Sequence, residues 1–217
     1  MRKLLTDRLQ VIFDNLPKAQ VFADIGCDHG YIAQAMLNYD KAKKVIISDL
    51  SEKCLNKAIN LLSEYVDSDR VISVVSDGFK SVPECDVALV AGMGGEEIVS
   101  ILQNAPFLPE KLVLQPMKNT DKVRRCVVEL GYKIVKDFLF VSSGKFYDLI
   151  VLKKGIDSLT DQEIEFGRTN LIQKNSAFSE FIKRELEKID LYLTRPNLSQ
   201  NAKSDLEKKK EKYSKYV

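Results

Sequence analysis

Two kinds of segment alternate along the first half of the chain, and this alternation is the strongest constraint on its fold. Short runs of β-branched and other apolar residues have the character of buried strands. They occupy residues 21–25, 45–50, 71–76, 87–91 and 112–115. Segments of helical length lie between or after them, at residues 31–39, 52–64, 95–104 and 119–130. Helices of this length connect parallel strands, so the pattern predicts an α/β fold with a mostly parallel sheet.

The pattern changes after Gly131. Two apolar runs, 132–141 and 147–154, are separated by a short turn that contains Gly144, with no helix between them. A short glycine-containing connection is typical of an antiparallel hairpin. We therefore expect this hairpin to close one edge of the sheet.

The end of the chain has a different character. Residues 1–155 hold nine of the ten glycines and five of the six prolines, so turns are rare afterwards. Thr160 and Glu163 have the spacing of a helix capping box, and apolar residues then recur at helical spacing until Pro196. A second helix is expected beyond this proline. We predict an α/β domain at 1–155 and a C-terminal α-helical coiled-coil hairpin at 156–217.

Composition narrows the classes of partner. The 33 Lys and Arg residues nearly balance the 31 Asp and Glu residues, so a nucleic-acid partner would require a local basic patch. No apolar run approaches the roughly 20 residues that span a membrane, and we expect a cytoplasmic protein without membrane contact. The four cysteines form no CxxC pair and the chain has one histidine, so we expect no metal site and treat the cysteines as small buried apolar residues.

The predicted first strand ends in a glycine-containing loop. Gly26 and Gly30 permit a tight turn into a helix, but Asp28 stands where a dinucleotide-binding fingerprint has its second glycine. A carboxylate there would repel a pyrophosphate and would suit a cationic ligand such as S-adenosylmethionine. The alternative is a purely structural turn.

Other strand ends carry similar candidates. Asp49 lies where an acidic residue accepts hydrogen bonds from ribose hydroxyls, although it could instead cap a helix. Asp77 and Gly78 could hold an adenine amino group or form a plain turn. Three glycines within residues 92–95 leave room for planar groups beside the main chain, and Gln115 precedes a proline that ends the fifth strand.

Together these motifs resemble those of a known family. ADIGCDHGY at 23–31, Asp49, SDGF at 76–79, AGMGG at 91–95, LQPM at 114–117 and GKFYDLIV at 144–151 occur in this order, before a helical extension. They are similar to the motifs of the bacterial tRNA (adenine-22-N1)-methyltransferases, the TrmK family of class I S-adenosylmethionine-dependent enzymes. The resemblance implies a Rossmann-like methyltransferase domain, a coiled-coil appendage and methylation of N1 of an adenine in the D arm of tRNA.

We predict three groups of site residues on this basis. His29 and Tyr31 are expected to hold the target base, the alternatives being a turn histidine and a core tyrosine. The predicted cofactor-binding residues are Asp24, Gly26, Cys27, Asp28, Gly30, Asp49, Leu50, Asp77, Gly78, Gly92, Met93, Gly94 and Gly95. The predicted substrate-binding residues are Arg8, Gln115, Pro116, Met117, Lys118 and Tyr147.

Binding of tRNA, the expected partner, requires cations, and no obligate protein partner is evident. The candidates are Arg2, Lys3 and Arg8 near the start, Lys118, Arg124 and Arg125 near the rim, and Lys208, Lys209, Lys210, Lys212 and Lys215 at the end, interleaved with Tyr213 and Tyr216. The last group could equally be an ordinary solvated helix.

Two other classes of function stay open at this point. A nicotinamide-dependent oxidoreductase would share the sheet and Asp49, but Asp28 and the missing GxGxxG motif disfavour it. A catalytically silent RNA-binding or interaction protein would keep the helical extension and lose the cofactor. Binding of S-adenosylmethionine, of NAD or of neither separates the three.

Overall fold

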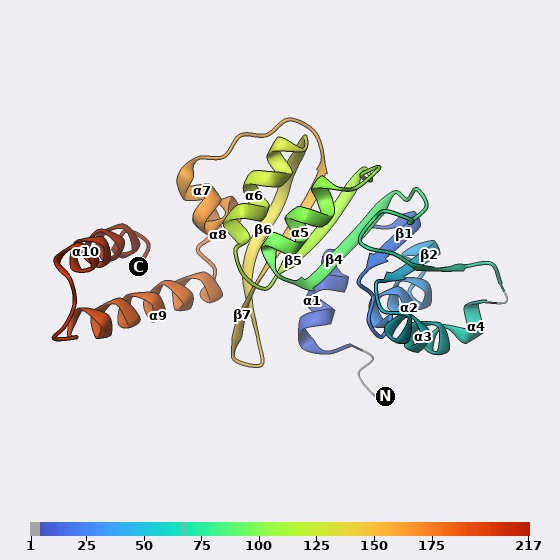
Figure 1. Cartoon of the computed structure of the whole chain (residues 1–217), viewed down its shortest axis with the longest axis horizontal. Helices are drawn as coiled ribbons and strands as arrows, with labels where there is room; N and C mark the ends of the chain where they lie inside the picture. Colours follow the sequence, from blue (N-terminus) through green and yellow to red (C-terminus); the bar gives the residue numbers. More distant parts are fainter. Residues whose placement is uncertain (1–4, 67) are drawn as a thin grey trace.

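A mixed β-sheet runs through the middle of the molecule, and the computed structural model describes residues 5–66 and 68–217 around it (Figure 1). Within these residues the sheet has seven strands in the order β3-β2-β1-β4-β5-β7-β6. The strands are β1 (Ala19–Ile25), β2 (Ala42–Asp49), β3 (Val71–Val75), β4 (Val87–Met93), β5 (Lys111–Pro116), β6 (Tyr132–Ser142) and β7 (Lys145–Lys154). The first five pair in parallel, whereas β7 is antiparallel to both β5 and β6. The predicted α/β sheet with an antiparallel hairpin at one edge is confirmed.

Helices cover both faces of this sheet. Those on one face are α1 (Asp7–Asn15), α2 (Tyr31–Asn38) and α3 (Glu52–Leu61), which the short α4 (Ser63–Val66) follows; those on the other are α5 (Gly95–Gln103) and α6 (Thr120–Glu129). Side chains along a strand alternate between faces. In β2, Val45 and Ile47 pack in the first core, while Ile46 packs in the second. Burial on both faces explains the continuously apolar strands.

Helix α1 was not expected from the sequence. The Thr6 side chain accepts a hydrogen bond from the Leu9 amide and caps the helix. Ile12 and Phe13 are buried against the sheet, and Leu16 ends the helix before Pro17. This capping residue and the spacing of the apolar residues were the available signal.

The predicted long helix from residue 160 to residue 193 is wrong, although its capping box at Thr160 and Glu163 is present. Three helices replace it: α7 (Asp161–Phe166), α8 (Arg168–Gln173) and α9 (Ser176–Leu193). Gly167 separates the first two with φ 83°, and a Cβ atom there would lie 2.7 Å from the Asp137 carboxylate. The chain bends because it passes directly over a buried ion pair. Asn175 then caps α9.

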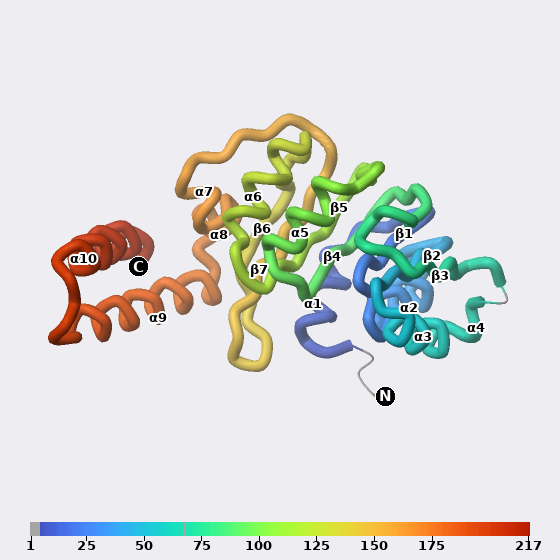
Figure 2. The backbone as a smooth tube through the Cα atoms, in the orientation of Figure 1, coloured from blue at the N-terminus to red at the C-terminus, as the bar shows by residue number. Residues whose placement is uncertain are grey.

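Helix α8 lies against β6, and α7 lies against α6 and α8. The Asp137 amide donates to the Thr169 hydroxyl at 2.9 Å, and the Leu139 amide donates to the Asn170 side chain at 2.9 Å. The backbone trace shows that α9 and α10 (Gln200–Ser214) project away from the sheet (Figure 2). A third apolar cluster, which includes Leu139, Phe166 and Tyr213, joins this helix pair to the rest of the protein. In the described part of the chain, no helix is long and apolar enough to cross a membrane.

Candidate functional site

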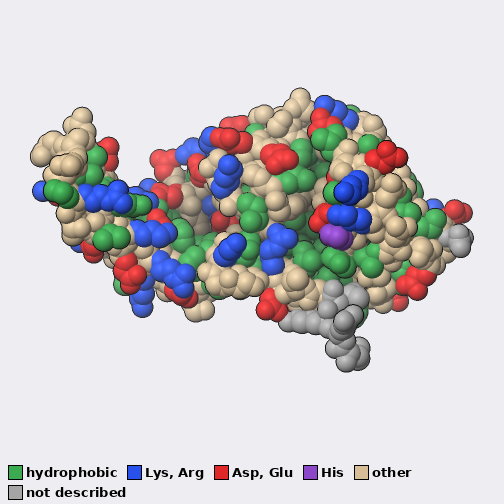
Figure 3. Space-filling model, turned by 60° about the horizontal axis from the view of Figure 1, so that its bottom comes forward, with side chains coloured by type: hydrophobic (Ala, Val, Ile, Leu, Met, Phe, Trp, Pro, Cys, Tyr) green, Lys and Arg blue, Asp and Glu red, His purple; other side chains and the backbone are tan. Residues whose placement is uncertain are grey.

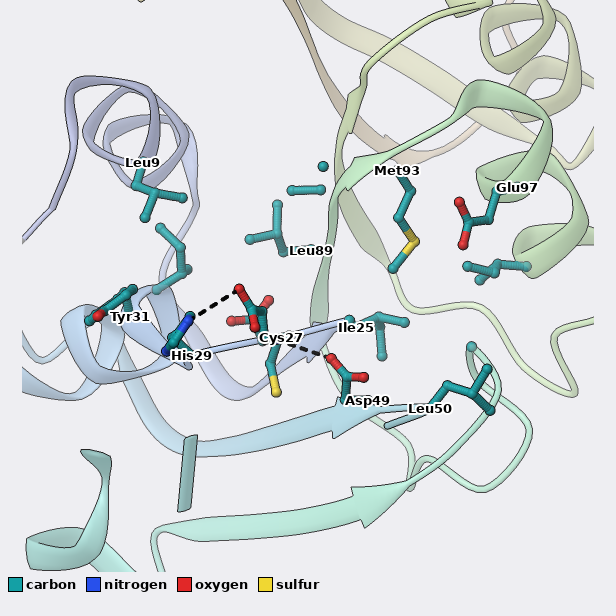
Figure 4. Close-up of a pocket in the computed structure, with 18 of the residues that line it drawn as sticks. Leu9, Ile25, Cys27, His29, Tyr31, Asp49, Leu50, Leu89, Met93 and Glu97 are labelled. Atoms are coloured by element: carbon teal, nitrogen blue, oxygen red, sulfur yellow. Dashed lines mark hydrogen bonds and ion pairs between the residues drawn. The ribbon is translucent and has the colours of Figure 1, made fainter. Parts of the chain in front are cut away.

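A cavity of about 660 Å³ opens at the carboxyl ends of the parallel strands (Figure 4). It combines thirteen of the predicted site residues from four loops and α1: Arg8, Asp24, Gly26, Cys27, Asp28, His29, Tyr31, Asp49, Leu50, Asp77, Gly78, Gly92 and Met93. Ligands of open α/β sheets bind at this edge. The cavity is also lined by residues that were not predicted from the sequence. They include Thr6 and Leu9 at the start of α1, Leu89 on β4, and Glu97 and Ile101 on α5. Gly30, Gly94, Gly95 and all of the predicted substrate residues except Arg8 do not line the cavity.

The loop after β1 is fixed by hydrogen bonds to β2. The amides of Gly26 and Cys27 both donate to the Ser48 carbonyl, at 2.7 and 3.0 Å. Gly26 has φ 73°, and a Cβ atom there would lie 2.1 Å from the Met93 methyl group. Glycine at this position therefore allows the Met93 side chain to lie across the loop.

Asp49 joins this loop to the next one. One carboxylate oxygen accepts from the Asp28 amide at 3.1 Å, and the other accepts from the Ser51 amide at 2.8 Å. Ser51 itself caps α3 through the Cys54 amide. Each carboxylate oxygen has a further acceptor position, so Asp49 can brace the loops and still accept hydrogen bonds from a ligand.

Asp24 is nearly buried at the base of the cavity, with 6% of its surface exposed. Burial raises the pKa of its carboxyl group to about 7, and the nearby Asp49 carboxylate adds to this effect. A hydrogen bond from the Ala33 amide acts in the opposite direction. This amide belongs to the first turn of α2, whose N-cap residue Gly30 offers no side chain, so Asp24 also caps that helix.

His29 and Tyr31 form an aromatic pair at one side of the cavity (Figure 4). Their ring centroids are 5.5 Å apart, with the planes inclined by 20°. Tyr31 is 41% exposed, so its interpretation as a core residue of α2 is wrong. The imidazole Nε2 atom lies 3.7 Å from the Asp28 carboxylate, which also faces Lys57 at 3.8 Å. Figure 3 shows the single histidine, in purple, at the surface between basic and acidic side chains.

The loops after β4 and β5 are joined through their main chains. The Met117 amide donates to the Met93 carbonyl at 2.8 Å, and the Gly95 amide donates to the Lys118 carbonyl at 2.9 Å. A Cβ atom on Gly95 would lie 2.4 Å from the Asn119 carbonyl oxygen. Close contact between these backbones explains the glycine at the start of α5.

The predicted substrate residues divide into two groups. Gln115 and Pro116 are buried, whereas Met117 and Lys118 are exposed. Arg8 reaches over Gln115 and contacts the ring of the half-buried Tyr147. Gln115 is therefore covered by Arg8 and is not presented at the rim.

The structure corrects several of the predicted RNA-binding cations. Arg124 is buried, because its guanidinium pairs with Asp137 and Asp148. Arg125 is exposed and lies 3.8 Å from Asp161. Arg2 and Lys3 lie outside the described residues.

Much of the C-terminal basic cluster serves packing. Lys209, Lys210 and Lys212 pair with Glu185, Asp190 and Glu165 respectively. Tyr213 and Tyr216 both pack on the Phe166 ring, and Tyr213 is buried, so the expected role of Tyr213 beside RNA is wrong. Lys208 and Lys215 are exposed.

The cysteines are all free thiols. Cys27 and Cys126 are buried, and Cys54 and Cys85 are half-buried, as the sequence suggested for small apolar residues. Burial raises the pKa of the Cys27 thiol, which lines the cavity, and nearby carboxylates raise it further. Among residues 5–66 and 68–217, no group of three or more His, Cys, Asp and Glu side chains could hold a metal ion.

The charge of the cavity favours a cationic ligand. Its acidic side chains are Asp24, Asp28, Asp49, Asp77 and Glu97. S-adenosylmethionine carries an ammonium and a sulfonium group, which match this lining. The two phosphates of a dinucleotide would be repelled.

Known proteins give a consistent comparison. The family model described as TrmK, tRNA (adenine(22)-N(1))-methyltransferase, matches residues 22–216. The tRNA (adenine(22)-N(1))-methyltransferase of Bacillus subtilis is 26% identical over 195 residues, which are 84% of this chain and 82% of that protein. A Streptococcus agalactiae structure from the NADB-Rossmann superfamily is 26% identical, with a TM-score of 0.88 over 98% of this chain and 96% of that one.

A structure of M. capricolum TrmK with bound S-adenosyl-homocysteine has the same fold. It is 23% identical, with a TM-score of 0.88 over 99% of this chain and 98% of that one. The acidic cavity, the seven-stranded sheet with its antiparallel hairpin and the family match over most of the chain lead to one conclusion. The chain belongs to the TrmK family of S-adenosylmethionine-dependent tRNA (adenine(22)-N(1))-methyltransferases.

Proposed function

We propose that the acidic cavity binds S-adenosylmethionine and that His29 and Tyr31 hold the adenine to be methylated. The observation that supports this most is the placement of an exposed aromatic pair beside a cluster of carboxylates in one cavity. Asp49 would accept hydrogen bonds from the ribose hydroxyls, and Asp77 would accept one from the adenine amino group of the cofactor. The carboxylates of Asp24 and Asp28 would favour its positive charges.

When bound, S-adenosylmethionine supplies an electrophilic methyl group. The adenine N1 atom attacks with a lone pair that is already free, so the protein needs no general base before methyl transfer. The adenine ring becomes cationic, and the carboxylates of the cavity favour that charge. Orientation of the reactants by the chain therefore supplies most of the rate, up to about 7 to 11 kcal/mol of the barrier.

The target adenine must be unpaired or flipped out of a helix, because N1 lies on its base-pairing edge. Stacking on an aromatic side chain offsets the loss of stacking in the RNA, by about 1 to 3 kcal/mol for each base. Tyr31 is suited to this role because its ring is partly exposed and already parallels His29.

We further propose that the α9–α10 pair forms part of the tRNA-binding surface, within a C-terminal unit separate from the methyltransferase domain. Lys208 and Lys215 are exposed and have no carboxylate within 4 Å in the described part of the chain. These two cations remain available to phosphates, unlike the lysines that pair with α7 and α9.

Mass spectrometry of nucleosides from treated tRNA tests this function. The protein with S-adenosylmethionine should produce 1-methyladenosine in tRNA, and no product should form when guanine replaces adenine 22. Calorimetry should show binding of S-adenosylmethionine and none of NAD. Binding of S-adenosylmethionine with unmodified tRNA would contradict the assigned reaction, and binding of neither ligand would favour a silent RNA-binding protein.

A further inference from the structure

Arg8 lines the cavity and is held there by two residues that are distant in the sequence. Its Nη1 atom donates to the Gln115 side-chain oxygen at 2.6 Å. Its guanidinium carbon lies 5.8 Å from the centroid of the Tyr147 ring. Helix α1, strand β5 and strand β7 therefore fix the guanidinium together, beside Gly92 of β4. The side chain has far less freedom than a surface arginine.

The polar atoms of Gln115 are engaged within the protein. Its side chain is fully buried, and its amide nitrogen donates to the Pro116 carbonyl at 3.0 Å and lies 3.6 Å from the Met117 sulfur. Its oxygen accepts from Arg8. The oxygen of the Gln115 side chain must point toward Arg8. In the flipped orientation the amide nitrogen would face Arg8, and this nitrogen cannot accept a hydrogen bond. Gln115 thus acts on Arg8 and has no route to the substrate itself.

The charge of Arg8 is opposite to that of its surroundings. Within the described lining of the cavity it is the one Lys or Arg residue, opposite five acidic residues. No carboxylate of the described chain lies within 4 Å of it. A guanidinium has five N–H donors, and the described contacts of Arg8 use one.

The ligands of the reaction offer this cation two kinds of anion: the carboxylate on the methionine part of S-adenosylmethionine, and the RNA phosphates. The cofactor is cationic at the reacting end, the adenine ring is neutral before methyl transfer, and it is cationic afterwards. A guanidinium would gain little from the reacting end of the cofactor or from the adenine ring, and an affinity for S-adenosylhomocysteine that is unchanged in Arg8→Gln would exclude the cofactor carboxylate as its partner. The RNA phosphates are the anions that accompany a flipped nucleotide to the mouth of the site.

We propose that Arg8 binds a phosphate that flanks the target adenosine, and that Gln115 is the positioning residue that aims Arg8 at it. This proposal rests on the proposed function of the same cavity. It assigns the two residues different tasks: Arg8 contacts the RNA, and Gln115 contacts Arg8.

Neutral phosphate analogues test the contact directly. Binding of tRNA to the full-length protein is measured with S-adenosylhomocysteine present, using tRNA with a methylphosphonate on the 5′ or the 3′ side of adenosine 22. The wild-type protein should bind one of these weaker than natural tRNA, and Arg8→Gln should bind that analogue and natural tRNA equally. If the wild-type protein is indifferent to both substitutions, or Arg8→Gln still discriminates, the phosphate assignment is wrong.

Salt dependence provides a second measurement. Loss of one phosphate contact lowers the slope of log affinity against log salt by about 0.7 to 0.9. The wild type should then lose about threefold more affinity than Arg8→Gln over a fourfold rise in salt. Arg70→Gln is the matched control, because Arg70 binds main-chain carbonyls of Ala42 and Lys43 at the opposite end of the sheet. An equal change of slope in both variants would contradict the proposal.

Gln115 requires variants that separate aiming from folding. Gln115→Met keeps the volume and removes the acceptor, so it should raise KM for tRNA, preserve the affinity for S-adenosylhomocysteine and have no further effect in the Arg8→Gln background. Gln115→Glu keeps a hydrogen-bond partner for Arg8, but the new carboxylate neutralises the charge of Arg8. The slope of log affinity for tRNA against log salt should therefore fall as in Arg8→Gln. Additive effects of Gln115→Met and Arg8→Gln, or an unchanged salt slope in Gln115→Glu, would remove the positioning role. Failure of the wild-type protein to bind S-adenosylhomocysteine would instead contradict the proposed function.

Discussion

The Asp28 amide donates a hydrogen bond to the Asp49 carboxylate, at 3.1 Å. This bond connects the loop after β1 with the end of β2, because the other oxygen of the same carboxylate accepts from the Ser51 amide. Asp49 thus shapes two of the loops that surround the cavity and retains acceptor positions toward it.

Asp49→Ala should weaken binding of S-adenosylmethionine by tenfold or more, because hydrogen bonds to charged groups contribute about 1.5 to 3 kcal/mol each. The protein should still fold, since Asp49 lies at the edge of the core and is half-buried. Calorimetry gives the dissociation constant, and circular dichroism on the same sample reports folding. An unchanged dissociation constant would remove Asp49 from the site.

His29→Ala and Tyr31→Ala should lower the rate of methyl transfer to tRNA and change the affinity for S-adenosylmethionine by only a few fold. Their rings stack on each other at the side of the cavity and are assigned to the target base. Tyr31→Phe keeps the stacking surface and should retain most of the rate. Equal losses of cofactor affinity and of rate would place these side chains at the cofactor.

The raised pKa of Asp24 should make stability depend on pH. The folded protein keeps a proton on this carboxyl group until about pH 7, whereas the unfolded chain releases it near pH 4. Its contribution to the free energy of unfolding is therefore full at low pH and is lost as the pH rises through this window. Asp24→Asn stays neutral and should be more stable than the wild type above about pH 7, by at most about 4 kcal/mol.

Urea unfolding of both proteins from about pH 5 to 8 measures this difference in the free energy of unfolding. The other carboxylates titrate alike in the two proteins, so their contributions cancel in the comparison. A cationic ligand favours ionised Asp24, so the affinity of the wild type for S-adenosylmethionine should rise through the same window, and that of Asp24→Asn should rise less. Parallel pH profiles for the two proteins would show that Asp24 does not have the raised pKa.

Arg124→Met should destabilise the protein by about 3 to 5 kcal/mol, because it leaves the fully buried Asp137 carboxylate without its cation. The neighbouring Arg125→Met is the control, since Arg125 is exposed and should contribute at most about 0.5 kcal/mol. Asp137→Asn in the Arg124→Met background should recover part of the loss. Equal unfolding midpoints for the two single variants would contradict burial of Arg124.

Joint replacement of Lys208 and Lys215 by glutamine should weaken tRNA binding and reduce its salt dependence, while binding of S-adenosylmethionine stays unchanged. This variant tests the α9–α10 surface without exposing the apolar cluster that contains Phe166 and Tyr213. A filter-binding series at several salt concentrations provides the measurement. Unchanged affinity and slope would show that these lysines are solvated and do not contact RNA.

The positions of the strands along the chain could be predicted from the sequence because each strand is a local run of apolar residues. Val45 to Ile47, for example, are apolar regardless of which neighbours they contact. The signal of helix α1, its Thr6 cap and the apolar residues after it, is also local but weaker than the pattern of the strands. The residues around the cavity were predictable as a group because parallel strands bring their carboxyl ends together.

Burial of charged and aromatic residues was not predictable in the same way. Arg124 and Arg125 are adjacent in the sequence, and only the position of Asp137 on β6 determines which of them is buried. In the sequence, Tyr213 lies in a lysine-rich segment and looks exposed. Its burial depends on contact with Phe166, which is distant in the sequence. Gly167 interrupts the long apolar stripe for a similar reason, since the ion pair beneath it exists only in the folded protein.

The main-chain bonds from Met117 to Met93 and from Gly95 to Lys118 also have a consequence for motion. They join the loop after β4 to the loop after β5, so we expect that neither moves outward alone. We therefore expect this edge of the cavity to open in one concerted movement. Hydrogen exchange should accordingly show the amides of Met117 and Gly95 protected to the same degree, and exchanging together.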